Sequence, residues 1–215
     1  DHRDRAAIQV FGMLVRVGDD VLGLAPRHAT SMVYYRNNIL HLIALPSLLA
    51  CCFLSNPSLR SADLQRLAWR IYPYISAELF LRWPESELEA VVLEYLQAMR
   101  SAGLLRAGSD GSWTAAPAAS AQAMQLSLLA QPTLQTIERY YLSIALLLRA
   151  GSGVLSQPEL EKRCQEMAQR MVTLYGFYSP EFFDRSLFEG FLSLLRRRGV
   201  IRADAAGKLV FDEVL

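Results

Sequence analysis

The sequence predicts a mainly α fold, a helical domain with two winged-helix-like repeats that carry short β-hairpins. Two observations predict it: apolar residues recur at helical spacing over long segments, and residues 57–116 match residues 153–212 at a constant spacing of 96. A hydrophobic content of 52% with 20% charged residues indicates a globular chain and excludes a disordered one. The net charge of +1 gives no long-range attraction to nucleic acid.

Residues 1–56 are expected to form a hairpin and apolar helices ahead of the repeats. Residues 5–14 carry apolar side chains spaced for one helix face. Residues 14–17 and 21–24 flank a Gly-Asp-Asp sequence whose backbone freedom suits a turn. This stretch therefore predicts two paired strands.

Two helices are predicted before the first repeat. Pro26 opens one that runs to about Asn37, and the other continues through the apolar stretch 39–54. Pro46 should kink or divide the second helix, because proline removes an internal hydrogen bond. A membrane-spanning helix needs roughly 20 apolar residues. The stretch is shorter and interrupted by polar residues, so we expect a core helix followed by a turn at 56–58.

Each repeat has the order helix, helix, a long helix opened by proline, a glycine, and two short strands. Proline is tolerated in a first helical turn, and a glycine after the last turn suits a left-handed C-cap. The predicted strand pairs are 104–106 with 113–115, and 200–202 with 208–211. A duplication or shared sub-fold is favoured over coincidence, although helix, glycine, strand is a common order. The matched residues are Leu64 and Leu160, Pro84 and Pro180, Leu96 and Leu192, Arg100 and Arg196, Gly103 and Gly199, Arg106 and Arg202, and Gly111 and Gly207.

The expected organisation has four parts: residues 1–56, a first repeat at 57–116, linking helices at 117–152, and a second repeat at 153–215. In the linking part, an Ala/Ser/Pro-rich loop leads into an apolar helix over residues 133–149. We expect this helix to pack centrally and to join the repeats through one apolar face made of Ile137, Tyr141, Ile144 and Leu148.

The cysteines and the remaining motifs predict no metal and no cofactor. Cys51, Cys52 and Cys164 are an odd number, and two of them lie in an apolar run. We expect reduced thiols of a cytosolic protein rather than a disulfide framework. His, Cys and acidic residues do not fall at zinc spacings. The sequence contains no glycine-rich phosphate loop and no Gly-x-Ser-x-Gly elbow.

Three stretches resemble one known family. They are Tyr34-Tyr35-Arg36-Asn37-Asn38 with the apolar segment that follows, Ala77-Glu78-Leu79-Phe80-Leu81-Arg82-Trp83, and Pro180-Glu181-Phe182-Phe183-Asp184. The chain is similar to the C-terminal domain of the large bacterial membrane-associated glycerol-3-phosphate 1-O-acyltransferases, over most of its length. The sequence opens without methionine, and the resemblance favours a piece of a longer protein with a catalytic region upstream.

The resemblance implies a function for the whole enzyme. The family moves an acyl group from acyl carrier protein or coenzyme A to the first hydroxyl of glycerol-3-phosphate, which starts phospholipid synthesis. It acts at the cytoplasmic face of the bacterial inner membrane. The partners implied are the upstream catalytic domain, the acyl donor and a membrane surface, but no nucleic acid.

No catalytic residue is expected in this chain. The family uses a His-x-x-x-x-Asp motif, in which the carboxylate orients an imidazole that takes the hydroxyl proton. The fifth residues after His2, His28 and His41 are Ala7, Val33 and Pro46. The chain alone should therefore be inactive and should buttress the catalytic domain, and His41 is interpreted as a hydrogen-bonded core histidine.

The first candidate site consists of Tyr35, Arg36, Asn37 and Asn38. Arg36 has the planar fork that binds a phosphate bidentately, and Asn38 suits the cap of the apolar helix. The alternative is that these residues tie the domain to the upstream region through buried hydrogen bonds. A single arginine without a basic cluster favours this alternative.

The second candidate site is formed by Arg196, Arg197 and Arg198 at the end of the last long helix. These side chains either contact anionic lipid headgroups or the acidic carrier protein, or complement the helix dipole as a cationic last turn.

The alternative function is a winged-helix module that binds nucleic acid or another protein. The order of helices and wing allows it. The would-be recognition helix between Glu85 and Glu94 is acidic, which disfavours nucleic acid.

Overall fold

The computed structural model describes residues 14–16, 22–24, 29–175 and 180–212, and it confirms a mainly helical fold with short antiparallel strands. The chain divides into two compact units, residues 1–42 and 43–215. The elements are β1 Leu14–Arg16, β2 Leu22–Leu24, α2 Ala29–Leu54, β3 Ser58–Arg60, α3 Ser61–Leu79, η2 Glu85–Glu87, α4 Leu88–Ser101, β4 Leu105–Ala107, β5 Ser112–Ala115, α5 Ala121–Ala150, α6 Gln157–Tyr175, η3 Pro180–Phe183, α7 Arg185–Arg197, β6 Arg202–Ala203 and β7 Leu209–Val210.

The first unit contains the predicted hairpin. β1 pairs with β2 in antiparallel register, with Leu14 opposite Leu24 and Arg16 opposite Leu22. The helix predicted over residues 5–14 falls outside the described residues, except that Leu14 belongs to β1.

α2 is one helix, so the predicted break near Asn37 is wrong. No glycine or proline stands there to end the helix. The predicted cap at Asn38 is also wrong, because this position lies in the helix interior. Pro46 is likewise inside the helix and does not divide it. The lost hydrogen bond is offset because Leu45 and Leu48, beside the proline, are fully buried.

The two repeats share their helices and the register of their hairpins at a spacing of 96 residues. α3 and α6 match residue for residue at both ends. In the hairpins, Arg106 lies opposite Thr114, and Arg202 lies opposite Val210. The structure therefore repeats a helix–helix–wing unit, while the exact four-part boundaries stay a prediction.

The glycine after each long helix adopts the predicted left-handed conformation, with φ of 74° at Gly103 and 73° at Gly199. The N–H of Gly103 donates to the carbonyl of Arg100 at 2.9 Å. The N–H of Leu104 donates to the carbonyl of Met99 at 2.9 Å, which completes a Schellman motif. The same two bonds recur after α7. The same type of turn therefore connects each long helix to its hairpin.

Two details differ from the predicted repeats. The turn expected at 56–58 is shorter than predicted, because Ser58 already belongs to β3. This strand pairs with β5 and gives a three-stranded sheet of order β3-β5-β4. In the second repeat the equivalent contact is a single bridge between Ser156 and Lys208. The prolines precede or open short 3-10 turns, η2 after Pro84 and η3 at Pro180, rather than the long helices themselves.

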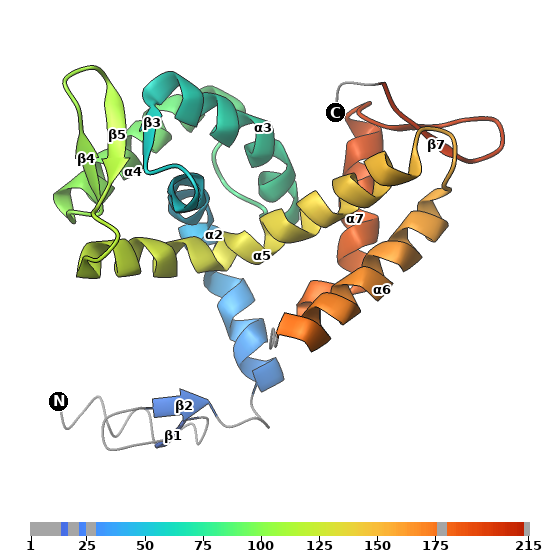
Figure 1. The fold of residues 1–215 in the computed structure, drawn as a ribbon, viewed down its shortest axis with the longest axis horizontal. Coiled ribbons are helices and arrows are strands. Elements are labelled where there is room, and N and C mark those ends of the chain that lie inside the picture. Colours follow the sequence, from blue (N-terminus) through green and yellow to red (C-terminus); the bar gives the residue numbers. More distant parts are fainter. Residues whose placement is uncertain (1–13, 17–21, 25–28, 176–179, 213–215) are drawn as a thin grey trace. The chain divides into compact units, whose positions relative to one another are not determined.

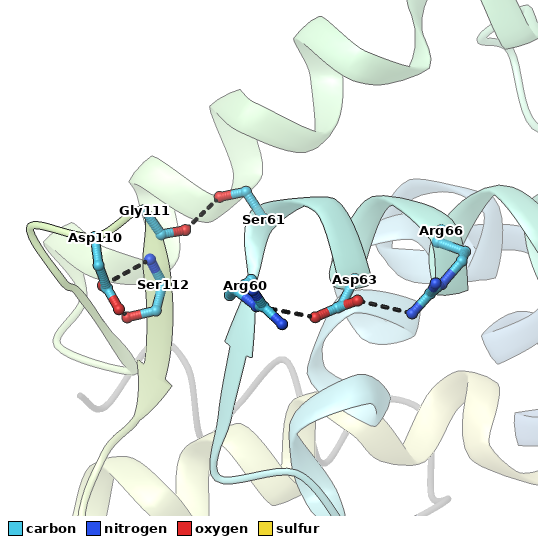
Figure 2. A network of polar contacts seen from close by, with 7 residues as sticks. All are labelled: Arg60, Ser61, Asp63, Arg66, Asp110, Gly111 and Ser112. Carbon is cyan, nitrogen blue, oxygen red and sulfur yellow. Dashed lines mark hydrogen bonds and ion pairs between the residues drawn. The ribbon is translucent and has the colours of Figure 1, made fainter.

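A polar network ties the first hairpin to the start of α3 (Figure 2). The hydroxyl of Ser61 donates to the carbonyl of Gly111 at 2.8 Å and accepts from Nε1 of Trp113 at 3.1 Å. In the hairpin turn, hydrogen bonds from the hydroxyl and N–H of Ser112 lower the pKa of Asp110. Surface ion pairs, which contribute little, join Asp63 to Arg60 and Arg66.

α5 joins the repeats, running from beside the first hairpin to the region of β7 (Figure 1). The prediction for its apolar face is wrong: Tyr141 is 74% exposed and Leu148 is 45% exposed. The buried face instead carries polar side chains, namely Thr133, Thr136, Arg139, Tyr140 and Ser143. Hydrogen bonds from α5 itself and from neighbouring helices satisfy most of these groups, which makes their burial affordable in free energy.

One of these contacts explains how α5 tolerates Pro132. The hydroxyl of Ser47 on α2 donates to the carbonyl of Ala130 at 3.0 Å and accepts from the N–H of Thr133 at 3.1 Å. Both backbone groups flank the proline, where the regular helical bonding is interrupted. Ser47 is fully buried, so α2 supplies the polar atoms that the proline-containing turn lacks.

Candidate functional site

A buried ion pair lies where α3 meets α5. Glu78 accepts hydrogen bonds from the guanidinium of Arg139 and from the hydroxyl of Tyr140 at 2.7 Å. The side chain of Arg139 is 4% exposed and that of Glu78 is 20% exposed. Nε of Arg139 is buried and finds no acceptor among the described residues. Because this desolvation is only partly compensated, the pair fixes how the helices meet more than it adds net stability.

Aromatic rings extend the junction to α7. The ring of Tyr140 stacks on that of Phe191, with centroids 4.0 Å apart and an interplanar angle of 10°. Tyr74 meets both rings edge-on, at 6.4 Å and 5.7 Å. The guanidinium of Arg198 lies 5.7 Å from the centre of the Tyr74 ring and pairs with Glu85 at 3.7 Å. The end of α7 is thereby held against the first repeat.

The electrostatics of the junction favour fixed hydrogen bonding rather than proton transfer. Burial, followed by the charge of Glu78, raises the pKa of Tyr140, so its hydroxyl stays protonated and remains a donor. A cavity of about 140 Å³ adjoins the pair and is lined in part by Glu78, Tyr140, Ser186 and Arg197. The carboxylate that faces this cavity already serves two donors, which suits a structural role.

A second polar network ties α6 to α7. The guanidinium of Arg185 donates to Glu161 at 3.0 Å and 3.2 Å, and the amide of Gln157 donates to the same carboxylate at 3.0 Å. Gln157 accepts in turn from Arg196 at 3.0 Å. One residue of the predicted arginine cluster is therefore engaged within the second repeat.

The predicted site residues fall in different units. Tyr35, Arg36, Asn37 and Asn38 belong to α2, but their side chains lie outside the described part of the chain. Arg196, Arg197 and Arg198 are exposed at the end of α7. Arg196 and Arg198 have the partners given above, whereas Arg197 makes no hydrogen bond or ion pair with any described residue.

The thiols and the described histidine offer no catalytic pairing. Burial raises the pKa of Cys51, raises that of Cys52 to about 12, and raises that of Cys164 to about 11, so all three stay protonated near neutral pH. His41 is exposed, so its interpretation as a core histidine is wrong.

Two further absences concern only the described ranges. Within them, no cluster of His, Cys, Asp and Glu is arranged to hold a metal ion. No helix there combines the length and the apolar character needed to cross a bilayer.

Sequence reasoning missed the junction residues, although two signals pointed to them. Glu78 lies inside one of the three stretches that carry the family resemblance. Arg139 lies within a long helix rich in apolar residues, where a buried charge requires a partner. Only the fold brings these positions together, because they are 61 residues apart.

Winged-helix-like repeats, joined through a buried ion pair and an aromatic cluster, define a mainly helical domain. The model of a protein family described as "Glycerol-3-phosphate acyltransferase C-terminal region" matches residues 5–204. The chain belongs to this family.

Curated relatives agree with the family match. The chain is 46% identical over 195 residues to a glycerol-3-phosphate acyltransferase of Pseudomonas aeruginosa, covering 91% of this chain and 23% of the relative. It is 45% identical to the corresponding protein of Pseudomonas fluorescens and 44% identical to that of Pseudomonas syringae, with the same coverage. The chain thus spans about a quarter of the length of these relatives.

Proposed function

We propose that this chain is the non-catalytic C-terminal part of a glycerol-3-phosphate 1-O-acyltransferase and that it buttresses the catalytic domain. The whole enzyme would transfer an acyl group from acyl carrier protein or coenzyme A to glycerol-3-phosphate and form 1-acyl-glycerol-3-phosphate. It would do so at the cytoplasmic face of the bacterial inner membrane. The observation that carries the proposal is the family match over residues 5–204. In the curated relatives, the matching region makes up only 23% of the length.

The chemistry of the described residues supports a non-catalytic role. The sequence contains no His-x-x-x-x-Asp, the arrangement in which a carboxylate orients a general base. The half-buried carboxylate of Glu78 accepts hydrogen bonds from Arg139 and Tyr140. The thiols are held protonated by burial. These groups can position helices but do not form a nucleophile and base pair.

Acyl transfer to labelled glycerol-3-phosphate tests the proposal. This chain alone, the upstream remainder of the longer protein alone, and the two mixed would be assayed. We expect no activity from this chain and activity in the mixture. Transfer by this chain alone would contradict the non-catalytic assignment, and full activity of the remainder that is unchanged on mixing would contradict the buttressing role.

Arg197 and Arg36, one from each candidate site, have testable parts in this function. Arg197 is the free cation of its cluster within the described residues, so it suits contact with anionic headgroups or with an acidic carrier protein. Arg197→Ala should raise KM for the acyl donor or weaken binding to anionic vesicles, whereas Arg196→Ala should mainly loosen α6 from α7.

For Arg36→Ala, a raised KM for glycerol-3-phosphate would favour phosphate binding over domain attachment.

A winged-helix module is the second candidate, and the strand order β3-β5-β4 is the observation that favours it. The helix that would enter a DNA groove carries the exposed acids Glu89 and Glu94, which repel phosphates. A salt-dependent shift of duplex DNA by the chain would support this candidate, and no binding at low salt would exclude it.

A further inference from the structure

The exposed apolar face of α5 is the largest departure from the expected packing. Tyr141 and Leu148 are 74% and 45% exposed, and Ile137 and Ile144 are half-buried beside them. These four residues recur at helical spacing on one side of the helix. A contiguous apolar stripe on a soluble surface marks an interaction site more often than isolated apolar residues do.

The first repeat contains the equivalent helix face, and there it is buried. α2 ends at Leu54 and α5 ends at Ala150, again 96 residues apart, so the two helices hold equivalent places in the repeats. The positions equivalent to Tyr141, Ile144 and Leu148 are Leu45, Leu48 and Cys52. They are 0%, 1% and 9% exposed. The same helix face is buried in one copy and open in the other.

The open face forms one wall of a groove, named here the α5 groove. Its volume is about 530 Å³. α5 contributes Tyr141 and Ile144, α3 contributes Arg70 and Tyr74, and α7 contributes Phe191 and Leu195. Arg70 is exposed and has no ion pair or hydrogen bond with any described residue. The groove thus combines an apolar floor with one uncompensated positive charge.

We propose that the α5 groove receives an apolar helix, carrying a carboxylate opposite Arg70, from the remaining part of the acyltransferase. This inference rests on the proposed function. The occupant is argued from the chain outside the structure, since this region covers only 23% of its relatives. An amphipathic helix that lays its apolar face into a groove is a recurrent mode of recognition.

The shape and charge of the groove disfavour other occupants. An isologous contact would place one concave groove against another and leave both unfilled. Attraction to an anionic bilayer rests on clusters of 4–8 basic residues. Among the described residues that line the groove, Arg70 is the one basic residue. A segment of the same protein fills a concave apolar surface and neutralises a single charge.

Site-specific crosslinking in the longer protein tests this proposal. A photoreactive phenylalanine analogue would replace Tyr141 or, as a matched control, Leu93, which is 49% exposed on α4 away from the groove. We expect the analogue at position 141 to crosslink to peptides upstream of this region and the one at 93 not to do so. Adding Arg70→Glu should reduce the crosslink, while Arg66→Glu, one helical turn away, should leave it. A crosslink from position 141 to lipid, to a second copy, or to nothing would overturn the proposal.

A second measurement separates this proposal from the function on which it rests. Tyr141→Asp should leave the urea midpoint of this chain unchanged, because the side chain is already exposed. In the longer protein it should lower the Tm and the acyl transfer rate, and Leu93→Asp should change neither. If Tyr141→Asp has no effect while the region is still required for activity, the groove is wrong and the buttressing role stands. If activity needs no part of this region, the proposed function fails whatever the crosslinks show.

Discussion

At the residue scale, the Glu78–Arg139 pair constrains how α3 and α5 meet. Its guanidinium is almost fully buried, and its carboxylate also holds Tyr140. Glu78→Gln should destabilise the chain by about 3 kcal/mol, since it leaves a buried cation unpaired. The loss would be measured as a lower urea midpoint with an unchanged m-value.

Two further variants identify the source of that loss. Glu78→Leu with Arg139→Met removes both charges, and we expect most of the stability to return, because apolar replacements of a buried pair are often neutral. Arg66→Met breaks an exposed pair with Asp63 and should change stability by less than about 1 kcal/mol. If the double variant is as unstable as Glu78→Gln, packing rather than the unpaired charge accounts for the effect.

Glu159 provides a prediction about pH. Its carboxylate accepts from Nζ of Lys208 and from the hydroxyl and N–H of Ser156, at 2.7–2.8 Å. The bond from Lys208, followed by those from Ser156, lowers the pKa of Glu159 from 4.5 to about 2. Because the folded-state pKa is lowered, its stabilisation is present above pH 4.5 and is lost as the pH falls towards 2.

A Tm series against pH measures this contribution. The Tm difference between the wild type and Glu159→Gln should be constant above pH 4.5 and should shrink below it. Glu166→Gln is the control, because its exposed pair with Lys162 is 4.0 Å long and should contribute little at any pH. An unchanged difference down to pH 2 would contradict the assignment.

At the scale of elements, the contact between α2 and α5 depends on Ser47. Ser47→Ala removes the acceptor of the buried N–H of Thr133 and the donor to the carbonyl of Ala130. An unsatisfied buried group costs up to a few kcal/mol, so we expect a loss of about 2 kcal/mol in urea unfolding. Thr173→Ala, whose hydroxyl bonds only within the exposed part of α6, should change stability far less. Equal losses for both variants would rule out the special role of Ser47.

Sequence patterns predicted the elements better than their environments. Gly103 and Gly199 marked the ends of the long helices, because a left-handed turn has a strong local preference for glycine. The exposure of the apolar face around Tyr141 could not be predicted. Periodicity shows that a helix face is apolar but not what covers it. The pairing of Glu78 with Arg139 was not predicted for the same reason, because it depends on tertiary packing.

At the scale of the whole molecule, α5 makes the two repeats of unit 43–215 depend on each other. Its first half contacts α2 through a hydrogen bond to Ser47. The hydroxyl of Tyr140, near its middle, donates to Glu78 of α3, and the Tyr140 ring stacks on Phe191 of α7. A helix shared in this way should couple the unfolding of both repeats into one transition. The alternative is stepwise loss of repeats, as in solenoids with weak interfaces.

The positions of the tryptophans allow a direct test of this coupling. Trp69, Trp83 and Trp113 all lie in the first repeat, so their fluorescence reports that repeat, whereas far-UV circular dichroism reports every helix. Phe188→Ala, at a fully buried site of the second repeat, should cost about 3–5 kcal/mol. Because unfolding is shared, we expect it to lower the fluorescence and dichroism midpoints in urea equally. A fluorescence midpoint that stays at the wild-type value, beside a biphasic dichroism curve, would show that the repeats unfold independently and that α5 does not couple them.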